Sequence, residues 1–105
     1  MVTTWLNDMK KLITNREEAE ELAVSALLFI ANDPELMPRF LNITGINASD
    51  IRQAAASKGF LAGVLQFILA HEPTLMAFSE RSGYPPQSIG EAVNFLPGGE
   101  QPIWL

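Results

Sequence analysis

The chain reads FIANDPELMPRFLNITGINASDIRQA at residues 29–54 and FILAHEPTLMAFSERSGYPPQSIGEA at residues 67–92, so that nearly the same pattern occurs twice. The shared positions are 38 or 39 residues apart: Phe29-Ile30, Pro34, Leu36-Met37, Phe40, Gly45, Ile51 and Ala54 recur as Phe67-Ile68, Pro73, Leu75-Met76, Phe78, Gly83, Ile89 and Ala92. A repeat of this length is typical of one supersecondary unit that is copied and packed against itself.

Apolar spacing predicts helices throughout, and no stretch shows the alternation of a strand. Each unit, about 17–55 and 58–96, is expected to hold a long helix, a helix that starts at a Pro, a Gly stop and a short helix. The inward positions expected on the two long helices are Ala19, Leu22, Ala23, Ala26, Leu27 and Ile30 in the first, and Phe60, Leu61, Val64, Leu65 and Ile68 in the second, which should span 58–71.

Helix ends are marked by capping residues. Thr14 or Asn15 is expected to cap the first long helix, with Glu17 or Glu18 completing a capping box. Asp33-Pro34 should start the next helix, since Asp is a good N-cap and Pro suits the first helical position. Gly45 and Gly83 are expected to end their helices in the left-handed conformation.

Further inward positions complete the predicted core. They are Leu36, Met37, Phe40 and Leu41 in the first unit, and Leu75, Met76, Phe78, Ile89, Val93 and Leu96 in the second. Ahead of the repeat, residues 3–13 predict a helix with Trp5, Met9, Leu12 and Ile13 on one face, and residues 97–105 read as a turn-rich tail. We therefore expect one all-α domain over 1–105, a compact bundle of about six or seven short helices with an internal two-fold sequence repeat.

Composition excludes several classes of function. The chain of 105 residues has no cysteine, which rules out disulfides, thiol nucleophiles and zinc–thiolate sites. Its formal charge of −5 argues against a broad nucleic-acid footprint. The apolar run at 60–70 is too short to span a bilayer, and Met1–Ile13 lacks the pattern of a secretory signal, so we expect a cytoplasmic protein.

No motif for catalysis, metal binding or cofactor binding stands out. His71 is the only histidine, and its neighbour Glu72 would not face it on a helix, so we expect an ordinary helix-end residue and neither a catalytic nor a metal site. The acidic run Glu17, Glu18, Glu20 and Glu21 is expected to be a solvated helix start. A cleft between the two units would be lined by Asn32-Asp33 and His71-Glu72, which are chemically different pairs.

The two ends of the chain carry its tryptophans. Trp5 and Met9 lie in the first predicted helix, and Ile103, Trp104 and Leu105 close the tail. Tryptophan is enriched at interfaces, so these five residues are candidates for contact with a partner protein or a second copy. The alternative is that both indoles pack on the chain's own core.

Three motifs together resemble a family of short, uncharacterised bacterial proteins classed as a domain of unknown function. They are Glu-Glu-Leu-Ala with Ala-Leu-x-Phe at 20–29, Asp-Pro before Phe-Leu-x-x-Thr-Gly at 33–45, and Phe-Leu-x-x-Val-Leu-x-Phe-Ile-Leu at 60–69. The resemblance covers about Glu18 to Pro97. It implies a small all-helical cytoplasmic protein and carries no active site over to this chain.

Our leading functional hypothesis is a non-enzymatic protein-interaction or regulatory module, with a protein partner or a homo-oligomer and no cofactor. One alternative is a DNA-binding regulator that uses residues 47–71, which hold Arg52, Gln53, Ser57 and Lys58 within a helix-turn-helix-like segment. Another is a small-molecule binder at the seam between the repeats, near Met37 and Met76. An anion site would require Arg39, Arg52 and Arg81 to lie together.

Overall fold

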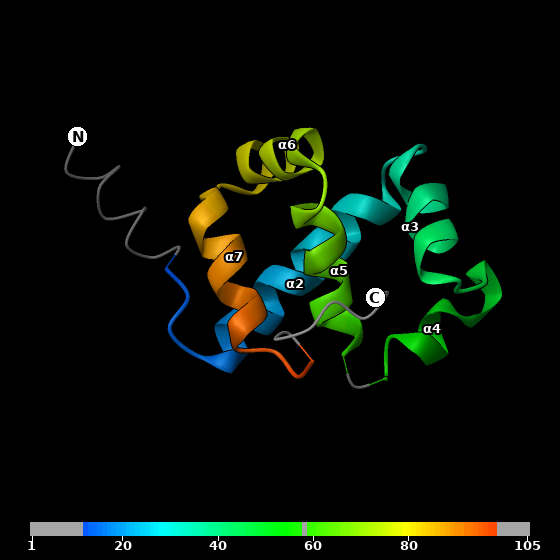
Figure 1. Ribbon diagram of the computed structural model, residues 1–105, viewed down its shortest axis with the longest axis horizontal. Helices are drawn as coiled ribbons and strands as arrows, with labels where there is room; N and C mark the ends of the chain where they lie inside the picture. Colours follow the sequence, from blue (N-terminus) through cyan, green and yellow to red (C-terminus); the bar gives the residue numbers. More distant parts are fainter. Residues whose placement is uncertain (1–11, 58, 99–105) are drawn as a thin grey trace.

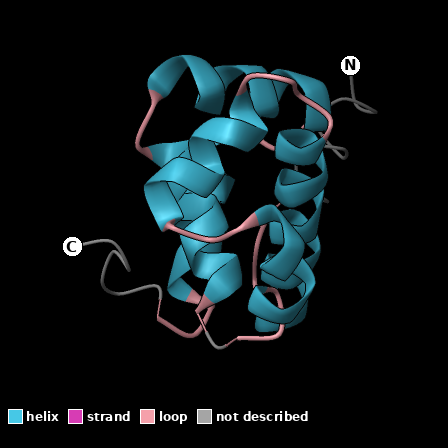
Figure 2. Ribbon diagram, turned by 90° about the vertical axis from the view of Figure 1, so that its right-hand side faces the viewer, coloured by secondary structure: helices cyan, strands magenta, loops and turns pink. Residues whose placement is uncertain are grey.

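Helices make up all the regular structure that is described. The computed structural model describes residues 12–57 and 59–98, and within these ranges it contains six α-helices, one 3₁₀ helix and no strand (Figures 1 and 2). The elements are α2 (Arg16–Ala31), α3 (Leu36–Thr44), η1 (Ala48–Asp50), α4 (Ile51–Ala54), α5 (Phe60–Leu69), α6 (Glu72–Ser82) and α7 (Pro86–Asn94). The predicted all-α class is confirmed.

The first long helix starts as its capping residues predict. Asn15 is extended, and its side-chain oxygen accepts a hydrogen bond from the backbone N–H of Glu18 at 2.8 Å. In return the carboxylate of Glu18 accepts from the backbone N–H of Thr14, also at 2.8 Å. This is the reciprocal arrangement of a capping box, with Thr14 in place of the cap residue itself.

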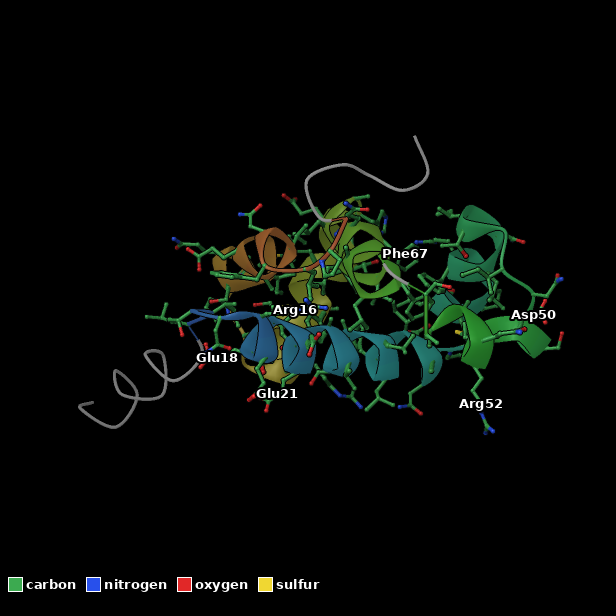
Figure 3. All side chains as sticks on the ribbon, turned by 90° about the horizontal axis from the view of Figure 1, so that it is seen from below. Arg16, Glu18, Glu21, Asp50, Arg52 and Phe67 are labelled. Atoms are coloured by element: carbon green, nitrogen blue, oxygen red, sulfur yellow. The ribbon has the colours of Figure 1, made fainter. Side chains whose placement is uncertain are left out.

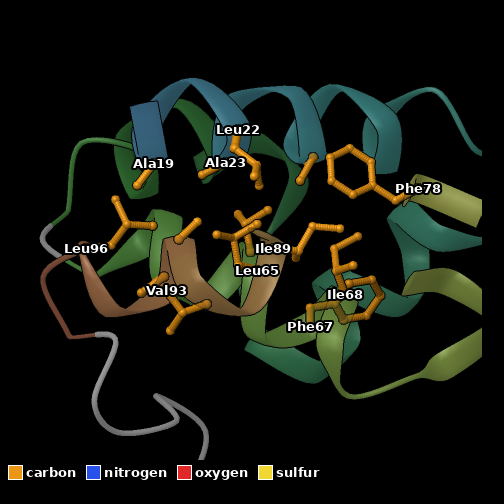
Figure 4. Close-up of a cluster of buried hydrophobic side chains, with 14 of the residues drawn as sticks. Ala19, Leu22, Ala23, Leu65, Phe67, Ile68, Phe78, Ile89, Val93 and Leu96 are labelled. Carbon is orange, nitrogen blue, oxygen red and sulfur yellow. The ribbon is translucent and has the colours of Figure 1, made fainter. Parts of the chain in front are cut away.

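The core lies where α2, α5 and α7 pack against one another (Figure 4). From α2 it receives Ala19, Leu22, Ala23, Ala26 and Ile30, all fully buried, while Leu27 is only partly buried. α5 buries most of its surface, because Ala62, Gly63 and Phe67 join the predicted inward positions. α7 contributes Ile89, Ala92 and Val93, and Leu96 closes the core just beyond it.

Three phenylalanines attach α3 to α5. The ring of Phe40 meets those of Phe60 and Phe67 edge to face, at centroid distances of 6.1 and 5.3 Å. α3 ends at Gly45 with φ = 75°, and α6 ends at Gly83 with φ = 85°. Both glycines therefore adopt the left-handed conformation that was predicted, one that side chains with a Cβ disfavour.

Some predicted boundaries are corrected. Leu12 and Ile13 are not helical, so the described end of the helix expected over 3–13 does not form, although Ile13 is buried. α5 covers 60–69 rather than 58–71. Pro34 lies in a turn and α3 begins at Leu36, but the Asp33 side chain still accepts from the backbone N–H groups of Glu35 and Leu36.

Met76 is also corrected, since it is exposed rather than inward. The buried positions of α6 are Thr74 and Phe78, each two residues from Met76. At 3.6 residues per turn, a step of two residues turns the side chain by about 200° to the other side of the helix. Met76 therefore points away from the face that packs on the bundle.

The two units of the sequence repeat do not pack alike. α7 buries four residues against α2 and α5, whereas α4, at the corresponding place in the first unit, buries none. Figure 1 shows α3 and α4 together at one end of the bundle, away from α7. The sequence similarity thus reflects shared caps and helix order more than equal tertiary contacts.

Within the described ranges no single helix is long and apolar enough to cross a membrane. α5 and α6 pass that test only when they are taken together, and they are bent by 109° at the break between them.

Ser88 in α7 supplies a stability prediction. Its hydroxyl is fully buried and makes no hydrogen bond with any described residue. A buried polar group without a partner gives up its hydrogen bonds to water and gains none in the folded chain. Ser88→Ala should therefore raise the free energy of unfolding by about 1 kcal/mol in urea denaturation. The control is Ser79→Ala, whose hydroxyl donates to the carbonyl of Tyr84 at 2.6 Å. That variant should lose about 1 kcal/mol, and equal effects at both serines would contradict the assignment.

Glu18 should make stability depend on pH. Hydrogen bonds from the backbone N–H and then the hydroxyl of Thr14 hold the pKa of Glu18 below the usual range of a glutamate. The pKa of Glu18 is lower in the folded chain than in the unfolded chain. The carboxylate therefore contributes its full stabilisation of the fold above the unfolded pKa, and this stabilisation is lost as pH falls through the folded pKa. We expect wild type to melt above Glu18→Gln at neutral pH and the two curves to converge in acid. Thermal melting is measured by circular dichroism. A difference in melting temperature between the two proteins that does not change with pH would refute this prediction.

Candidate functional site

A concave feature with an aromatic floor lies between α2 and the α6–α7 connection. We call it the seam pocket; it has a volume of about 400 Å³ and is lined by Ser25, Leu28, Phe29, Asn32, Asp33, Phe78, Arg81, Ser82 and Tyr84. Residues before 34 come from the first sequence unit and those from 78 onward come from the second. The pocket therefore lies at the seam between the two units.

The floor of the seam pocket is apolar. The rings of Phe29 and Phe78 lie 5.4 Å apart at an interplanar angle of 55°, and Phe78 is almost fully buried. Leu28 stands at the rim with 57% of its surface exposed. An exposed leucine beside an aromatic floor leaves apolar surface that a ligand could cover.

The position of these residues follows from the packing of α2. Its core-facing stripe includes Leu22, Ala26 and Ile30, so Ser25, Leu28 and Phe29 fall on the adjacent side of the helix. α6 packs on that side. Gly83 then turns the chain back, and the hydroxyl of Ser79 holds the carbonyl of Tyr84 at 2.6 Å, which places Tyr84 at the pocket.

The polar rim is partly fixed by local hydrogen bonds. Asp33 caps the following turn through two backbone N–H groups, at 2.8 and 3.0 Å, and the side-chain nitrogen of Asn32 donates to the carbonyl of Leu28 at 2.9 Å. Arg81 is exposed and forms no ion pair with another residue of the described ranges. Its guanidinium is thus the strongest hydrogen-bond donor that the pocket offers to a ligand.

A shallower depression continues from the seam pocket along α2. It shares Ser25 and Tyr84 with the pocket and is otherwise lined by Val24 and by Glu17, Glu20 and Glu21, which we call the acidic edge. Glu17 and Glu21 are exposed, whereas Glu20 pairs with Arg16 at 3.2 Å. Burial, then the charges of Glu21 and Glu18, raise the pKa of the Tyr84 phenol. The negative field of α2 therefore reaches the mouth of the pocket.

Comparison with known families places the chain. A family described as "Protein of unknown function (DUF3572)" matches residues 16–99. The chain belongs to this family. The comparison with curated proteins found no match, and neither did the comparison with solved structures. The DUF3572 match covers α2 through α7, so every residue of the seam pocket and of the acidic edge lies inside the family's region.

The five residues predicted for interaction, Trp5, Met9, Ile103, Trp104 and Leu105, lie outside the described residues and outside the DUF3572 match. The seam site predicted near Met37 and Met76 needs correction. A pocket does lie at the seam, but Met37 is packed against the core, Met76 is exposed, and neither lines it. Of the pairs before each Pro, only Asn32 and Asp33 line the pocket.

His71 lies in a different place. Its Nδ1 is 2.8 Å from the hydroxyl of Thr74, within the first turn of α6. With Arg39, Ile43, Phe67 and Ala70 it lines a smaller pocket of about 270 Å³. The three arginines of the anion-site hypothesis do not lie together. Arg39 lines this smaller pocket, Arg81 lines the seam pocket, and Arg52 lines neither of the two pockets. Figure 3 places Arg52 at the opposite end of the molecule from Glu18 and Glu21.

Within the described ranges, no group of three or more His, Cys, Asp or Glu side chains is placed to hold a metal ion. The sequence predicted a cleft between the two units at Asn32-Asp33, and both residues line the seam pocket. Its aromatic floor and Arg81 were not predicted, because these residue types form no motif. A signal in the sequence was the presence of large apolar residues off the core stripe of α2, Val24 and Leu28.

Proposed function

We propose that the protein is a non-enzymatic protein-interaction module that binds a segment of a partner protein at the seam pocket. The observation that carries the proposal is the exposed Leu28 beside the Phe29–Phe78 floor, in a recess with an apolar floor and a polar rim at the surface of a chain of −5 net charge. Recesses of this kind accept apolar anchor side chains, and buried anchors contribute most of the affinity of protein interfaces. We also propose that the protein acts in the cytoplasm.

The chemistry of the pocket supports a binding role over a catalytic one. Its lining offers hydroxyls, one amide, one carboxylate and one guanidinium, and no described histidine, lysine or cysteine lines it to activate a nucleophile. One oxygen of the Asp33 carboxylate, Oδ1, already accepts two backbone hydrogen bonds as a helix cap. These groups suit the orientation of a bound chain through hydrogen bonds at the rim.

The test compares two exposed apolar residues. Leu28→Glu places a charge at the rim of the seam pocket, and Ile43→Glu places one on α3, where Ile43 is 46% exposed and lies outside that pocket. Tagged wild type should enrich a protein from its native extract after nuclease treatment. Ile43→Glu should retain that protein, and Leu28→Glu should lose it at least ten-fold by quantitative mass spectrometry.

Equal enrichment by the two variants would refute the proposal, provided that circular dichroism shows both to be folded. Enrichment that disappears on nuclease treatment would point to nucleic acid instead. We do not propose DNA binding, because α4 is a single turn of four residues that follows the acidic Asp50, which leaves little helix to enter a groove.

Binding of a small apolar molecule is the second candidate function. It is favoured by the volume of about 400 Å³, which falls within the range of ligand pockets, and by the floor of two aromatic rings. Protein-detected NMR with a fragment library would distinguish it. Fragments that shift the resonances of Phe29 and Phe78, together with the absence of any Leu28-dependent protein from the extract, would favour the small molecule.

A further inference from the structure

The seam pocket and the acidic edge adjoin each other, and together we call them the groove. Ser25 and Tyr84 line both depressions, so the apolar floor and the carboxylates lie on either side of these two residues. Along α2 the groove extends from Glu17 to Leu28 and beyond, which at 1.5 Å per residue is about 16 Å or three helical turns. That length matches a short helix or an extended segment of five or six residues.

The two parts of the groove differ in charge. The seam pocket holds one cation and one anion, Arg81 and Asp33, and is close to neutral. The acidic edge holds three carboxylates, and among the described residues only Glu20 pairs with a cation, Arg16. An occupant that fills the groove therefore gains most by carrying positive charge at the edge and an apolar side chain at the floor.

Resting on the proposed function, we propose that the partner segment is cationic and amphipathic, with an apolar anchor between Leu28 and the Phe29–Phe78 floor and Lys or Arg side chains against Glu17 and Glu21. Charge complementarity selects this occupant over two others. A second copy of the chain brings seven basic and twelve acidic residues, and a nucleic acid brings phosphates, so both are repelled by the edge.

Arg81 adds a direction to the contact. Its guanidinium can donate to a backbone carbonyl or a carboxylate of the segment near the anchor, while the basic side chains lie toward the N-terminal half of α2. A Lys or Arg of the partner segment would be repelled by the guanidinium of Arg81. We therefore expect no basic residue in the segment next to the anchor on the side of Arg81.

The experiment is selection of a displayed library of random 14-residue peptides on the full chain, with Leu28→Glu as the counter-selection. Enriched peptides are then measured by fluorescence anisotropy against Glu17→Gln/Glu21→Gln. The matched control is Asp50→Asn/Glu72→Gln, which removes the same charge from exposed positions that line neither part of the groove. We expect an excess of Lys and Arg in the enriched peptides, about five-fold weaker binding by the edge variant, and no change in the control.

Each outcome decides between the two claims. Peptides that require Leu28 but show no basic excess, or that bind the edge variant as well as wild type, overturn this inference and leave the proposed function standing. If no enriched peptide depends on Leu28, both are overturned. If basic peptides bind the edge variant and the control equally weakly, their affinity depends only on the net charge of the chain, and the inference is again overturned.

Discussion

Replacing Phe40 by alanine is expected to lower the free energy of unfolding by about 3–5 kcal/mol. Phe40 is 1% exposed, and its ring contacts both Phe60 and Phe67 edge to face, so the change removes buried surface and leaves a cavity between α3 and α5. A domain of this size has about 5–15 kcal/mol in total, so this loss would be a large fraction of its stability. Urea denaturation followed by circular dichroism measures the loss.

Phe95→Ala is the matched control, because the same ring is 40% exposed just beyond α7. Its loss should be clearly smaller than that of Phe40→Ala, since the ring is already partly exposed in the folded chain. If Phe40→Ala cost no more than Phe95→Ala, α3 would not depend on the aromatic cluster for its place in the bundle. Phe40→Leu should recover much of the loss by filling the cavity again.

Local chemistry explains which features the sequence could predict. The cap at Asn15 and the left-handed residues Gly45 and Gly83 depend on only a few neighbouring residues, and the structure places all three as predicted. Burial of Ile89 and Val93 followed from spacing along one helix. Such features need no knowledge of how the helices are arranged in space.

Features that depend on helix arrangement were predicted less well. Met76 was expected inward by analogy with Met37, but the face that α6 presents is set by its packing on α2 and α5, which buries Thr74 and Phe78 instead. The seam pocket depends on Phe29 meeting Phe78 across two units. No spacing rule within one helix specifies that contact, so the sequence could suggest a cleft at Asn32-Asp33 but not its aromatic floor.

The second large effect is expected at Leu65, in the middle of α5. Leu65→Ala should cost about 2–5 kcal/mol of unfolding free energy, because the side chain is fully buried where α5 meets α2 and α7. Figure 4 shows Leu65 among Leu22 of α2 and Ile89 of α7, so a cavity there removes contacts from three helices at once. Backbone packing on several sides also limits how far the site can collapse, which places the cost toward the upper part of the range.

Leu61→Ala is the control, since it makes the same change one turn earlier on the same helix, where the leucine is only partly buried. We expect it to cost about half as much as Leu65→Ala or less, because the exposed part of the side chain contributes little. Equal losses of unfolding free energy at the two leucines would contradict the tight packing of Leu65 between α2, α5 and α7. A larger loss at Leu65 would place most of the stability of the fold in the core that α2, α5 and α7 share.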